Sequence, residues 1–586
     1  MWSLGQTRMR DIWIKSAVGV AAAAFLVAAA YAGGGWEPQA PVYPEPDDAW
    51  DAQCIEEGIE GPAVGTDAPN AVQDYFPDEP TFGILSDNPT TDETQDATED
   101  GTATAPTSGK KSYSTYRALD EYLDENFDAA GTPGIGVVVV DAAGAEYERT
   151  MGDIESDHDT MLIGSLTKSF TALSIMQLVE DGKIDLDEPV ATYCDAYGTP
   201  DNVTIRMLLN QTSGFGYYDS LAEATPGLTQ GTFSYSNANY DLLGKVIEAV
   251  SGEAYDEYVE DHILEPLEMD DSSASLEARA SAHAWRNYFG WNVQDGFVHE
   301  DGDDSWGSWS SGYMATSTAD MGKYLMMYLN QGTQTATGGA QVLSAAGIRQ
   351  MFLSRAADPY SDAFYGMGWI SFYWDDGELV LSHDGDVENG VARMMIFPER
   401  GIAIAVLGDA ADAFGGNTAF YELADGVVAN VVGGKAEPVS ATERIATHAQ
   451  EDAFLALFVL LAVAPIVRLR RWRKWIGRLP HDVSLWRLVC LHVLAPLGIL
   501  CMPVLQGYKW RDVLTFMPDV SIVYIGSAAV LFLTGAAKLL FMLHVWKKER
   551  GRELAAEAWL LRETRKACRI APAGLFHVTG SCGSLR

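Results

Sequence analysis

The sequence predicts an α+β fold in which an antiparallel sheet is flanked by helices and carries a helical subdomain, with a bundle of three transmembrane helices at the C-terminus. Two observations support this prediction. Strand-like segments open and close residues 112–436, with a mostly helical pattern between them, which favours one sheet built from both ends of a domain. Three apolar stretches then follow, at Ala453–Val467, Leu488–Leu505 and Val520–Ala537.

The charge is divided between unlike segments. The 586 residues include 39 basic and 82 acidic side chains, a formal net charge of −43. Residues 1–32 carry a net +2 and residues 451–586 a net +10, whereas residues 33–450 hold 17 basic and 72 acidic side chains, a net −55. An acidic chain lacks the basic face that a nucleic-acid-binding protein needs. We therefore expect no nucleic-acid partner.

The N-terminal segment, residues 1–32, is predicted to be a signal peptide or a signal anchor. Basic residues precede the uncharged run Ala17–Ala32, as in a secretory leader, and the sequence leaves cleavage open. Residues 33–111 are acidic, rich in Pro, Thr and Gly, and contain no Lys or Arg before Lys110, so we expect a disordered linker. Cys54 in this linker and Cys194 are the two cysteines predicted to lie outside, and a disulfide between them is one option.

Basic residues around the apolar stretches predict a membrane topology. A cluster of Lys and Arg separates the first two stretches and another follows the third, whereas the loop between the second and third carries only Lys509 and Arg511. By the positive-inside rule, residues 33–450 lie outside and the C-terminus is cytoplasmic. We expect a multi-pass cell-membrane protein with an extracytoplasmic domain, a linker at 437–450, three membrane helices within 451–546 and a basic cytoplasmic tail at 547–586.

The elements of residues 112–436 follow from hydrophobic spacing. Apolar residues from Tyr116 recur at helical spacing until Gly131, and two strands joined by a short turn follow as a hairpin. From Ser165 to about Phe352 the pattern is mostly helical. Three further strands and a final helix close the domain. The predicted strands and final helix are Gly134–Asp141, Ala145–Thr150, Glu378–Ser382, Val391–Phe397, Ile402–Leu407 and Thr418–Val432.

The first candidate for chemistry is Ser165-Leu166-Thr167-Lys168, which opens an amphipathic helix. Residues at positions i and i+3 lie on one face of a helix, so the Lys168 amine can reach the Ser165 hydroxyl. A serine in the first turn also meets the positive end of the helix dipole. For Lys168 to act as a base its pKa must fall by about 3 units, which burial can supply.

Two further motifs complete the candidate site. Tyr235-Ser236-Asn237 lies in a loop leading into a helix, and on an extended segment the phenol and the amide face the same side. The phenol can relay a proton and Asn237 can hold a substrate carbonyl. His383-Asp384-Gly385 ends a predicted strand, where glycine lets a substrate backbone approach. The chain contains no G-x-S-x-G motif and no H-E-x-x-H motif, and we expect no metal and no cofactor.

In this order the motifs resemble the serine β-lactamase-related family, which includes class C β-lactamases, D-alanyl-D-alanine carboxypeptidases and related esterases. The resemblance covers about residues 112–432 and extends beyond the three motifs. It includes Pro133-Gly134 before the hairpin, Ile163–Phe170 around the serine, Leu178–Leu186 after it, Thr212-Ser213-Gly214, Pro266-Leu267-Glu268-Met269 and Tyr365-Gly366-Met367-Gly368-Trp369.

This resemblance implies a β-lactamase/transpeptidase-like fold and an acyl-enzyme mechanism. Ser165 is implied as the nucleophile, Lys168 as its base and Tyr235 as the proton shuttle to the leaving group and to water. Asn237 is implied to position the substrate. The strand with His383 and Gly385 is implied to lie along the site, and the backbone amides of Ser165 and Asp386 to form the oxyanion hole.

The strand motif departs from the Lys-Thr-Gly of related enzymes. Asp384 stands where carboxylate-recognising members have a hydroxyl residue, with Asp386 and Glu388 close by. If Asp384 faces the site ionised, it repels an anionic substrate terminus. We therefore expect weak β-lactamase and weak D-Ala-D-Ala carboxypeptidase activity, with better turnover of neutral or cationic esters or amides.

Two readings of the whole chain are open. The first is a membrane-tethered serine hydrolase acting on a small-molecule or peptide substrate, with the lipid bilayer as its other partner. The second is a receptor that binds or is acylated by cell-wall fragments or β-lactams without turnover. A third idea, transport through the spans, rests on Lys538 and His492, and an anchoring role is the plainer account. The sequence leaves the oligomeric state open.

Overall fold

The computed structural model describes residues 116–570, apart from 196, 289–291, 296–298, 300–301, 375–376, 413–415, 477–480 and 506–508. The chain divides into two units, Met1–Pro80 and Thr81–Arg586, and every described residue belongs to the second. The predicted N-terminal leader, the acidic linker to residue 111 and Cys54 therefore lie outside the described residues.

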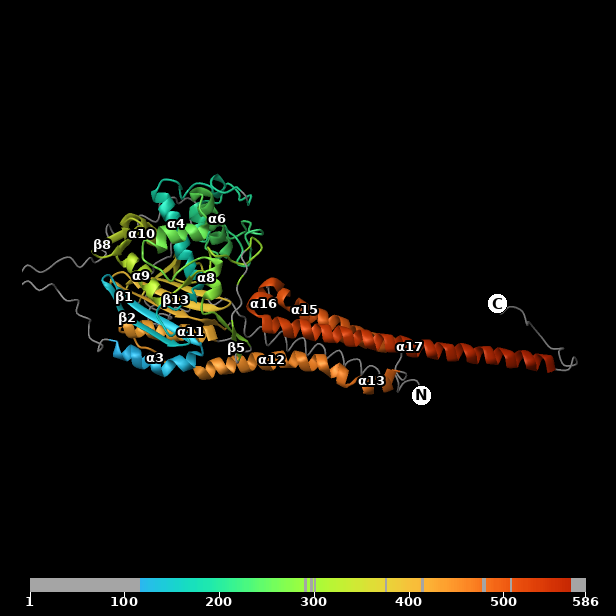
Figure 1. Ribbon diagram of the computed structural model, residues 1–586. Coiled ribbons are helices and arrows are strands. Elements are labelled where there is room, and N and C mark those ends of the chain that lie inside the picture. The colour runs from blue at the N-terminus through green and yellow to red at the C-terminus, as the bar shows by residue number, and fades with distance from the viewer. Residues whose placement is uncertain are drawn as a thin grey trace, which may run out of the picture. The chain divides into compact units, whose positions relative to one another are not determined.

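The centre of the domain is an eight-stranded antiparallel sheet that joins both ends of the domain, as predicted (Figure 1). The first strand of the hairpin, β1, pairs along its length with β14 near the end of the domain, with Ile135 opposite Gly408 and Asp141 opposite Ile402. The strands, in their order across the sheet, are β2 (Gly144–Gly152), β1 (Gly134–Asp141), β14 (Ile402–Gly408), β13 (Gly390–Phe397), β12 (Leu379–Val387), β11 (Trp369–Tyr373), β10 (Phe364–Gly366) and β9 (Ala356–Ala357).

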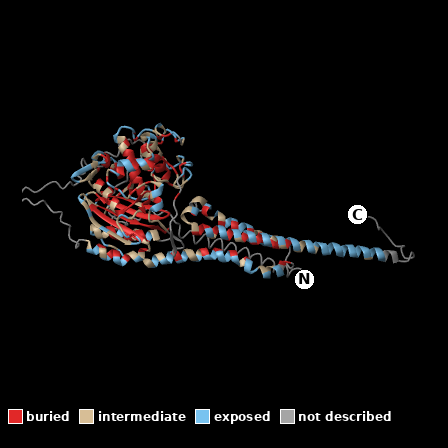
Figure 2. Ribbon diagram, in the orientation of Figure 1, coloured by how far each residue is buried: buried red, intermediate tan, exposed pale blue. Residues whose placement is uncertain are grey.

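Figure 2 shows the strands of the sheet largely buried, and their side chains belong to apolar clusters on both faces of the sheet. In β1, Val137 and Val139 are buried in a cluster with helices α3 (Arg117–Ala130) and α11 (Gly416–Val432). Val138 and Val140 point the other way and belong to a second cluster with α4 (Thr167–Glu180) and α9 (Thr318–Leu329). Successive side chains of a strand point to opposite faces, so one valine run serves both layers.

Helices are the main regular structure between residues 165 and 352, and short strands that the sequence did not predict occur in this region and near its ends. The remaining helices here are α5 (Ile205–Leu209), α6 (Asn237–Ser251), α7 (Tyr255–Val259), α8 (Leu276–Ser281) and α10 (Ala345–Leu353). The short strands are β3 (Met161–Leu162), β4 (Trp285–Tyr288), β5 (Asn292–Asp295), β6 (Ala315–Thr316), β7 (Thr333–Thr335), β8 (Gly338–Gln341) and, later in the chain, β15 (Ala410–Ala411). Such strands are too short for a reliable alternation pattern.

Strand β12 corrects a predicted boundary. The sequence placed the strand end at Ser382, yet β12 continues to Val387, so His383, Asp384 and Gly385 lie within the strand. Beyond Ser382 the strand still pairs with β13, from His383 opposite Met394 to Val387 opposite Gly390. On its other side, β11 pairs with β12 only as far as Ser382. The polar residues after Ser382 do not end the strand, because their backbone continues to pair with β13.

An ion triad fixes the sheet to α11. The Arg393 guanidinium on β13 donates to both carboxylate oxygens of Asp384 at 2.6 and 2.8 Å, and also contacts Asp425 on α11. Arg393 is buried, with 7% of its side chain exposed, so its charge depends on these two carboxylates. Burial of an ion costs several kcal/mol unless partners of good geometry compensate it.

A clasp near the domain ends joins α3 to the segment after α11. The Tyr122 hydroxyl lies 3.3 Å from the carbonyl oxygen of Glu422 and 3.2 Å from that of Glu437, and the Val439 amide donates to Asn126 Oδ1 at 2.8 Å. Arg444 of α12 (Ala441–Val467) donates to the carbonyl of Ala129 at 3.1 Å. Helix α12 therefore begins at Ala441, within the segment predicted to be a linker.

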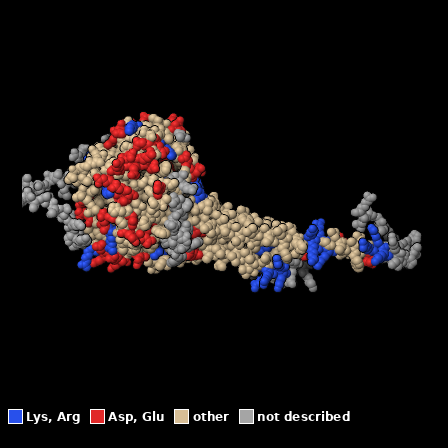
Figure 3. Space-filling view, viewed as in Figure 1, with Lys and Arg blue, Asp and Glu red and all other residues tan. Residues whose placement is uncertain are grey.

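Three helices are long and apolar enough to cross a membrane, at Ala441–Lys474, His481–Leu505 and Pro518–Lys566. They contain all three predicted apolar stretches. Figure 3 shows acidic residues over the α+β domain, and an uncharged band along these helices followed by Lys and Arg. The helices of this part are α12, α13 (Leu469–Trp475), α14 (His481–Val489), α15 (Ala495–Leu505), α16 (Trp510–Phe516) and α17 (Pro518–Ile570). Helix α17 continues well into the predicted tail.

Replacing Arg393 by alanine is expected to destabilise the domain by about 3–5 kcal/mol, because Asp384 and Asp425 lose the cation that compensates them. Arg117→Ala is the matched control, since the Arg117–Glu121 pair is exposed and contributes less than about 0.5 kcal/mol. Thermal unfolding of the two variants measures the difference. Equal melting temperatures would show that the triad does not hold α11 to the sheet.

Candidate active site

Ser165 lies in a single 3₁₀ turn, Gly164–Leu166, immediately before α4. This turn packs against the backbone of β12 so closely that two glycines are needed. A Cβ on Gly164, whose φ is +55°, would lie 2.6 Å from the Asp386 amide nitrogen, and a Cβ on Gly385 would lie 2.1 Å from the Ile163 carbonyl oxygen. The Ser165 turn therefore lies beside the Gly385–Asp386 backbone. The Ser165 and Asp386 amides, which are predicted to form the oxyanion hole, lie on these two adjacent segments.

Lys168 is fully buried, and its amine has three polar neighbours. Nζ lies 3.0 Å from Ser165 Oγ, 2.7 Å from Asn237 Oδ1 and 2.6 Å from the Ser311 carbonyl oxygen. The Ser311 carbonyl accepts only, and so does Asn237 Oδ1. A neutral amine therefore uses its two N–H bonds on them, which leaves its lone pair directed toward the Ser165 hydroxyl.

Burial lowers the pKa of Lys168 to about 7, and the negative charge of Asp241 opposes this shift. Both neutral and charged amine are then populated near neutral pH. The three acceptors suit the ammonium form, whereas the dry surroundings favour the neutral form. This balance is what a general base working near pH 7 requires.

Tyr235 also contacts Ser165. Its hydroxyl donates to Ser165 Oγ at 2.8 Å, and its ring centroid lies 4.8 Å from Lys168 Nζ. Burial holds the Tyr235 pKa well above its usual value, so the phenol stays protonated and acts as a donor. Asn237 is the first residue of α6, not part of an extended segment as predicted, yet its side chain still reaches the Lys168 amine.

His383 faces the same side of β12 as the Ser165 turn and is neutral. Burial, followed by the nearby Lys168 charge, lowers its pKa to about 4. Nδ1 lies 2.7 Å from the Asp384 carbonyl oxygen, which can only accept, so Nδ1 carries the proton. Nε2 is then an acceptor, and the Tyr365 hydroxyl donates to it at 3.3 Å.

Asp384 and Asp386 point to the opposite face of β12, toward α11. Asp384 is held by Arg393, while Asp386 accepts from Asn417 at 2.8 Å and from the Tyr421 hydroxyl at 2.9 Å. Burial raises the pKa of Asp386 to about 6. The expected repulsion of anionic substrates by Asp384 therefore loses its premise, because its charge is compensated on the far side of the strand.

The structure thus brings together Ser165, Lys168, Tyr235, Asn237, His383 and the backbone at Gly385, and separates the Asp384 and Asp386 side chains from them. Sequence reasoning missed three contributors: the Ser311 carbonyl, Asp241 and Tyr365. Asp241 follows Asn237 by one helical turn, which was a usable signal. A backbone carbonyl such as that of Ser311 leaves no trace in residue identity.

An aromatic wall lies beside Tyr235. The Tyr217 ring centroid is 6.2 Å from that of Tyr235 and 5.6 Å from that of Trp306, whose indole nitrogen donates to the Tyr217 carbonyl at 2.7 Å. Phe516 of α16 packs edge-on against Trp306 at 4.8 Å. The neighbouring Lys509 donates to the Tyr218 carbonyl at 2.9 Å, so the loop between the second and third apolar helices contacts this wall.

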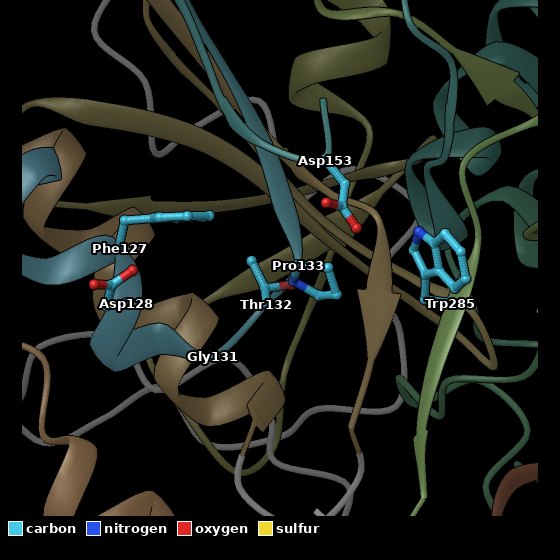
Figure 4. Close-up of a pocket in the computed structure, with 7 residues that line it drawn as sticks. All are labelled: Phe127, Asp128, Gly131, Thr132, Pro133, Asp153 and Trp285. Atoms are coloured by element: carbon cyan, nitrogen blue, oxygen red, sulfur yellow. The ribbon is translucent and has the colours of Figure 1, made fainter. Parts of the chain in front are cut away.

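A pocket of about 460 Å³ lies elsewhere in the domain (Figure 4). It is lined by Phe127, Asp128, Gly131, Thr132, Pro133, Asp153 and Trp285, and by none of the predicted site residues. Within the described parts of the chain, no group of three or more His, Cys, Asp or Glu side chains is arranged to hold a metal ion.

In the apolar helices, Lys538 and His492 contact each other at 2.9 Å, and the second nitrogen of His492 lies 2.7 Å from the Leu531 carbonyl oxygen.

The chain is similar to several known proteins. A family model described as Beta-lactamase matches residues 119–425. Protein flp of Staphylococcus aureus strain MW2 is 24% identical over 471 residues, covering 72% of this chain and 90% of flp. Penicillin-binding protein 4 of Amycolatopsis lactamdurans is 25% identical over 325 residues, 49% of this chain and 84% of that protein. The solved structure of an octameric penicillin-binding protein homologue from Pyrococcus abyssi is 26% identical, with a TM-score of 0.46, and the match covers 56% of this chain and 79% of that one.

The rate at which a fluorophosphonate labels Ser165 is expected to rise with pH, with a midpoint near the Lys168 pKa of about 7. Only the neutral amine accepts the serine proton, and lowering the pH through 7 charges it. His383, with a pKa of about 4, stays neutral over this range. Gel fluorescence of the full chain gives the profile, with Ser165→Ala as the blank. A rate independent of pH between about 5.5 and 8.5 would exclude Lys168 as the base.

Proposed function

Since this chain belongs to the Beta-lactamase family, we propose that it is a membrane-tethered, extracytoplasmic serine hydrolase that acts through an acyl-enzyme on an ester, amide or peptide bond. The observation that carries this proposal is the convergence on one hydroxyl. Ser165 Oγ lies 3.0 Å from the Lys168 amine and 2.8 Å from the Tyr235 phenol. A nucleophile with a base and a separate acid in hydrogen-bond reach supports covalent catalysis.

The geometry supports a two-step reaction. Lys168 takes the Ser165 proton as Oγ attacks the substrate carbonyl carbon, and the carbonyl oxygen gains the negative charge that the backbone amides of Ser165 and Asp386 stabilise. The bond to the leaving group then breaks, and the Tyr235 phenol gives it a proton, which Lys168 replaces. Water attacks the acyl-enzyme carbonyl, transfers its proton along the same route, and releases Ser165.

The charges around the site support uncharged or cationic substrates. His383 is neutral, and the Arg393 cation is already paired with Asp384 and Asp425. Among the described side chains, Lys168 is the one cation within hydrogen-bond distance of Ser165, and it is fully buried. A substrate carboxylate therefore finds no unpaired cation along β12. The wall of Tyr217 and Trp306 favours substrates with an apolar or aromatic group beside the scissile bond.

Turnover of neutral esters is expected to exceed turnover of cephalosporins. Relative to the spontaneous reaction of each compound, kcat/KM for p-nitrophenyl acetate should be roughly tenfold or more above that for a chromogenic cephalosporin. His383→Lys places a cation on the strand and should raise cephalosporin turnover relative to ester turnover, whereas His383→Gln should not. Fast cephalosporin hydrolysis by the unchanged chain would refute the proposed preference.

A receptor that is acylated without turnover is the competing function, and one experiment separates the two. The detergent-solubilised full chain is exposed to a fluorescent penicillin and to a fluorophosphonate, and the mass of the acylated chain is followed over time. A hydrolase loses the penicilloyl mass, while a receptor keeps it. Label on Ser165→Ala, or absence of label on the unchanged chain, would contradict both functions.

The contact between Lys509 and the Tyr218–Glu223 segment supports an external domain, because the loop after the second apolar helix then lies on the same side of the membrane as the site. The basic residues after the first and third helices support the opposite side for the tail. In intact cells, a membrane-impermeant maleimide should label Lys183→Cys and should spare Arg565→Cys until the cells are permeabilised. Labelling of the unchanged chain gives the background from its native cysteines. Labelling of Arg565→Cys in intact cells would contradict the proposed topology.

A further inference from the structure

The Ser311 carbonyl that contacts Lys168 belongs to a turn, Ser308–Ser311, held by its own hydrogen bonds. The Ser308 amide donates to Ser311 Oγ at 2.9 Å, and Ser311 Oγ lies 3.3 Å from the Ser308 carbonyl oxygen. Thr171 on α4 donates to the Ser310 carbonyl at 2.6 Å. The turn is therefore fixed to the helix that carries Lys168, and its position determines where the amine is held.

Asp241 contacts the same turn through the Ser308 hydroxyl. It lies on α6, four residues after Asn237, and is buried, with 4% of the residue exposed. The Ser308 hydroxyl donates to Asp241 Oδ1 at 2.6 Å, and the Ser310 hydroxyl donates to the carbonyl of Tyr240 at 3.1 Å. One helix thus presents Asn237 directly to Lys168 and Asp241 to the turn that supplies the third contact.

We propose that Asp241 is a positioning residue for Lys168: it fixes the turn that presents the Ser311 carbonyl, and its charge sets the pH range in which the amine accepts the serine proton. This inference rests on the proposed function, in which Lys168 is the base. It assigns a role to a residue that touches neither the nucleophile nor the substrate.

The charges in this part of the site give the direction of the effect. Facing Lys168 are Tyr235, Tyr240, His383 and Asp241, and the two tyrosines stay neutral because burial raises their pKa values. His383 is neutral above a pKa of about 4. This leaves Asp241 as the anion that acts on the amine at pH values above its own pKa, which burial raises to about 6.

Asp241 in turn faces Lys168 and His299. His299 pairs with Glu388 at 3.1 Å, and its second ring nitrogen lies 3.0 Å from the Gly307 carbonyl oxygen, just before the turn. Burial alone would lower the pKa of Lys168 further, and a weaker base gains less proton-transfer driving force. The Asp241 carboxylate therefore keeps the pKa of Lys168 higher than burial alone would allow, although the amine is excluded from water.

A purely structural role predicts a different outcome. If Asp241 only accepts the Ser308 hydrogen bond, then the isosteric Asp241→Asn keeps an acceptor there and leaves the pH dependence of Ser165 reactivity unchanged. If its charge acts on Lys168, the same variant makes the amine easier to deprotonate. The midpoint of the pH profile should then move downward by about half a unit or more.

The test measures fluorophosphonate inactivation of the full chain in detergent from about pH 5 to about pH 9 for four proteins. These are the unchanged chain, Asp241→Asn, Ser308→Ala and Asp320→Asn. Asp320 is the matched control because it is a buried acid that bonds Ser272 and Asp271, away from Lys168. We expect a downward shift for Asp241→Asn, an unchanged midpoint with a slower rate for Ser308→Ala, and an unchanged profile for Asp320→Asn.

Each outcome has a separate meaning. An unchanged midpoint in a folded Asp241→Asn protein overturns the inference and leaves the proposed hydrolase intact. Failure of the unchanged chain to label at Ser165 overturns the proposed function itself. If Asp241→Asn does not fold by circular dichroism, Asp241→Glu gives the second measurement: it retains the charge, so its midpoint should stay near that of the unchanged chain, and a downward shift would contradict the role of the charge.

Discussion

The burial of one amine is the constraint on which the rest of the site depends. Lys168 has no exposed surface, so its charge must be supported by fixed acceptors instead of water. Asn237 and the Ser311 carbonyl supply this support, and the Asp241 carboxylate stands one hydrogen bond behind the turn. Each of these groups comes from a different part of the chain than the Ser165 turn. The helical subdomain is therefore a shell that excludes water from one nitrogen atom, in addition to covering the sheet.

The sheet gives this shell its fixed reference. Strand β12 is paired to β13 along the part that passes the site, and β13 is paired to β14 and through it to β1. The Gly164 turn rests on the backbone of β12 with no room for a side chain between them. The positions of Ser165 and of the Ser165 and Asp386 amides are thus set by backbone contacts, which side-chain motion disturbs little. Arg393 fixes the other face of the same strands to α11 without contributing to the reaction side.

Much of this could be read from the sequence, where the information is local. The β1–β2 hairpin, the serine three residues before the lysine, and the presence of strands β12, β13 and β14 follow from spacing alone. The expectation that Asp384 faces the substrate failed because it ignored the alternation of side chains along the strand. Asp384 and Asp386 share one face of β12 and His383 lies on the other, so the twofold alternation already forbade all three side chains from facing a substrate. The roles of Ser311, Asp241 and Tyr365 depend on contacts between distant segments, which hydrophobic spacing does not encode. The short strands β9, β10 and β11 were missed for a related reason, since strands of two to five residues are defined by their partners more than by their own pattern.

The clasp between α3 and the start of α12 has a mechanical consequence. Residues before α3 and after α11 lead toward the two apolar ends of the chain, and the contacts of Tyr122, Asn126 and Arg444 join these exits directly to each other. Tension between the two ends is then carried across this short bridge, in parallel with the β1–β14 pair, and does not pass through β12 or the Ser165 turn. A domain loaded in this way keeps the spacing of Ser165 and Lys168 while the segments outside the domain are stretched. In the proposed tethered arrangement, tension on the chain would displace the domain before it altered the 3.0 Å contact between Lys168 and Ser165.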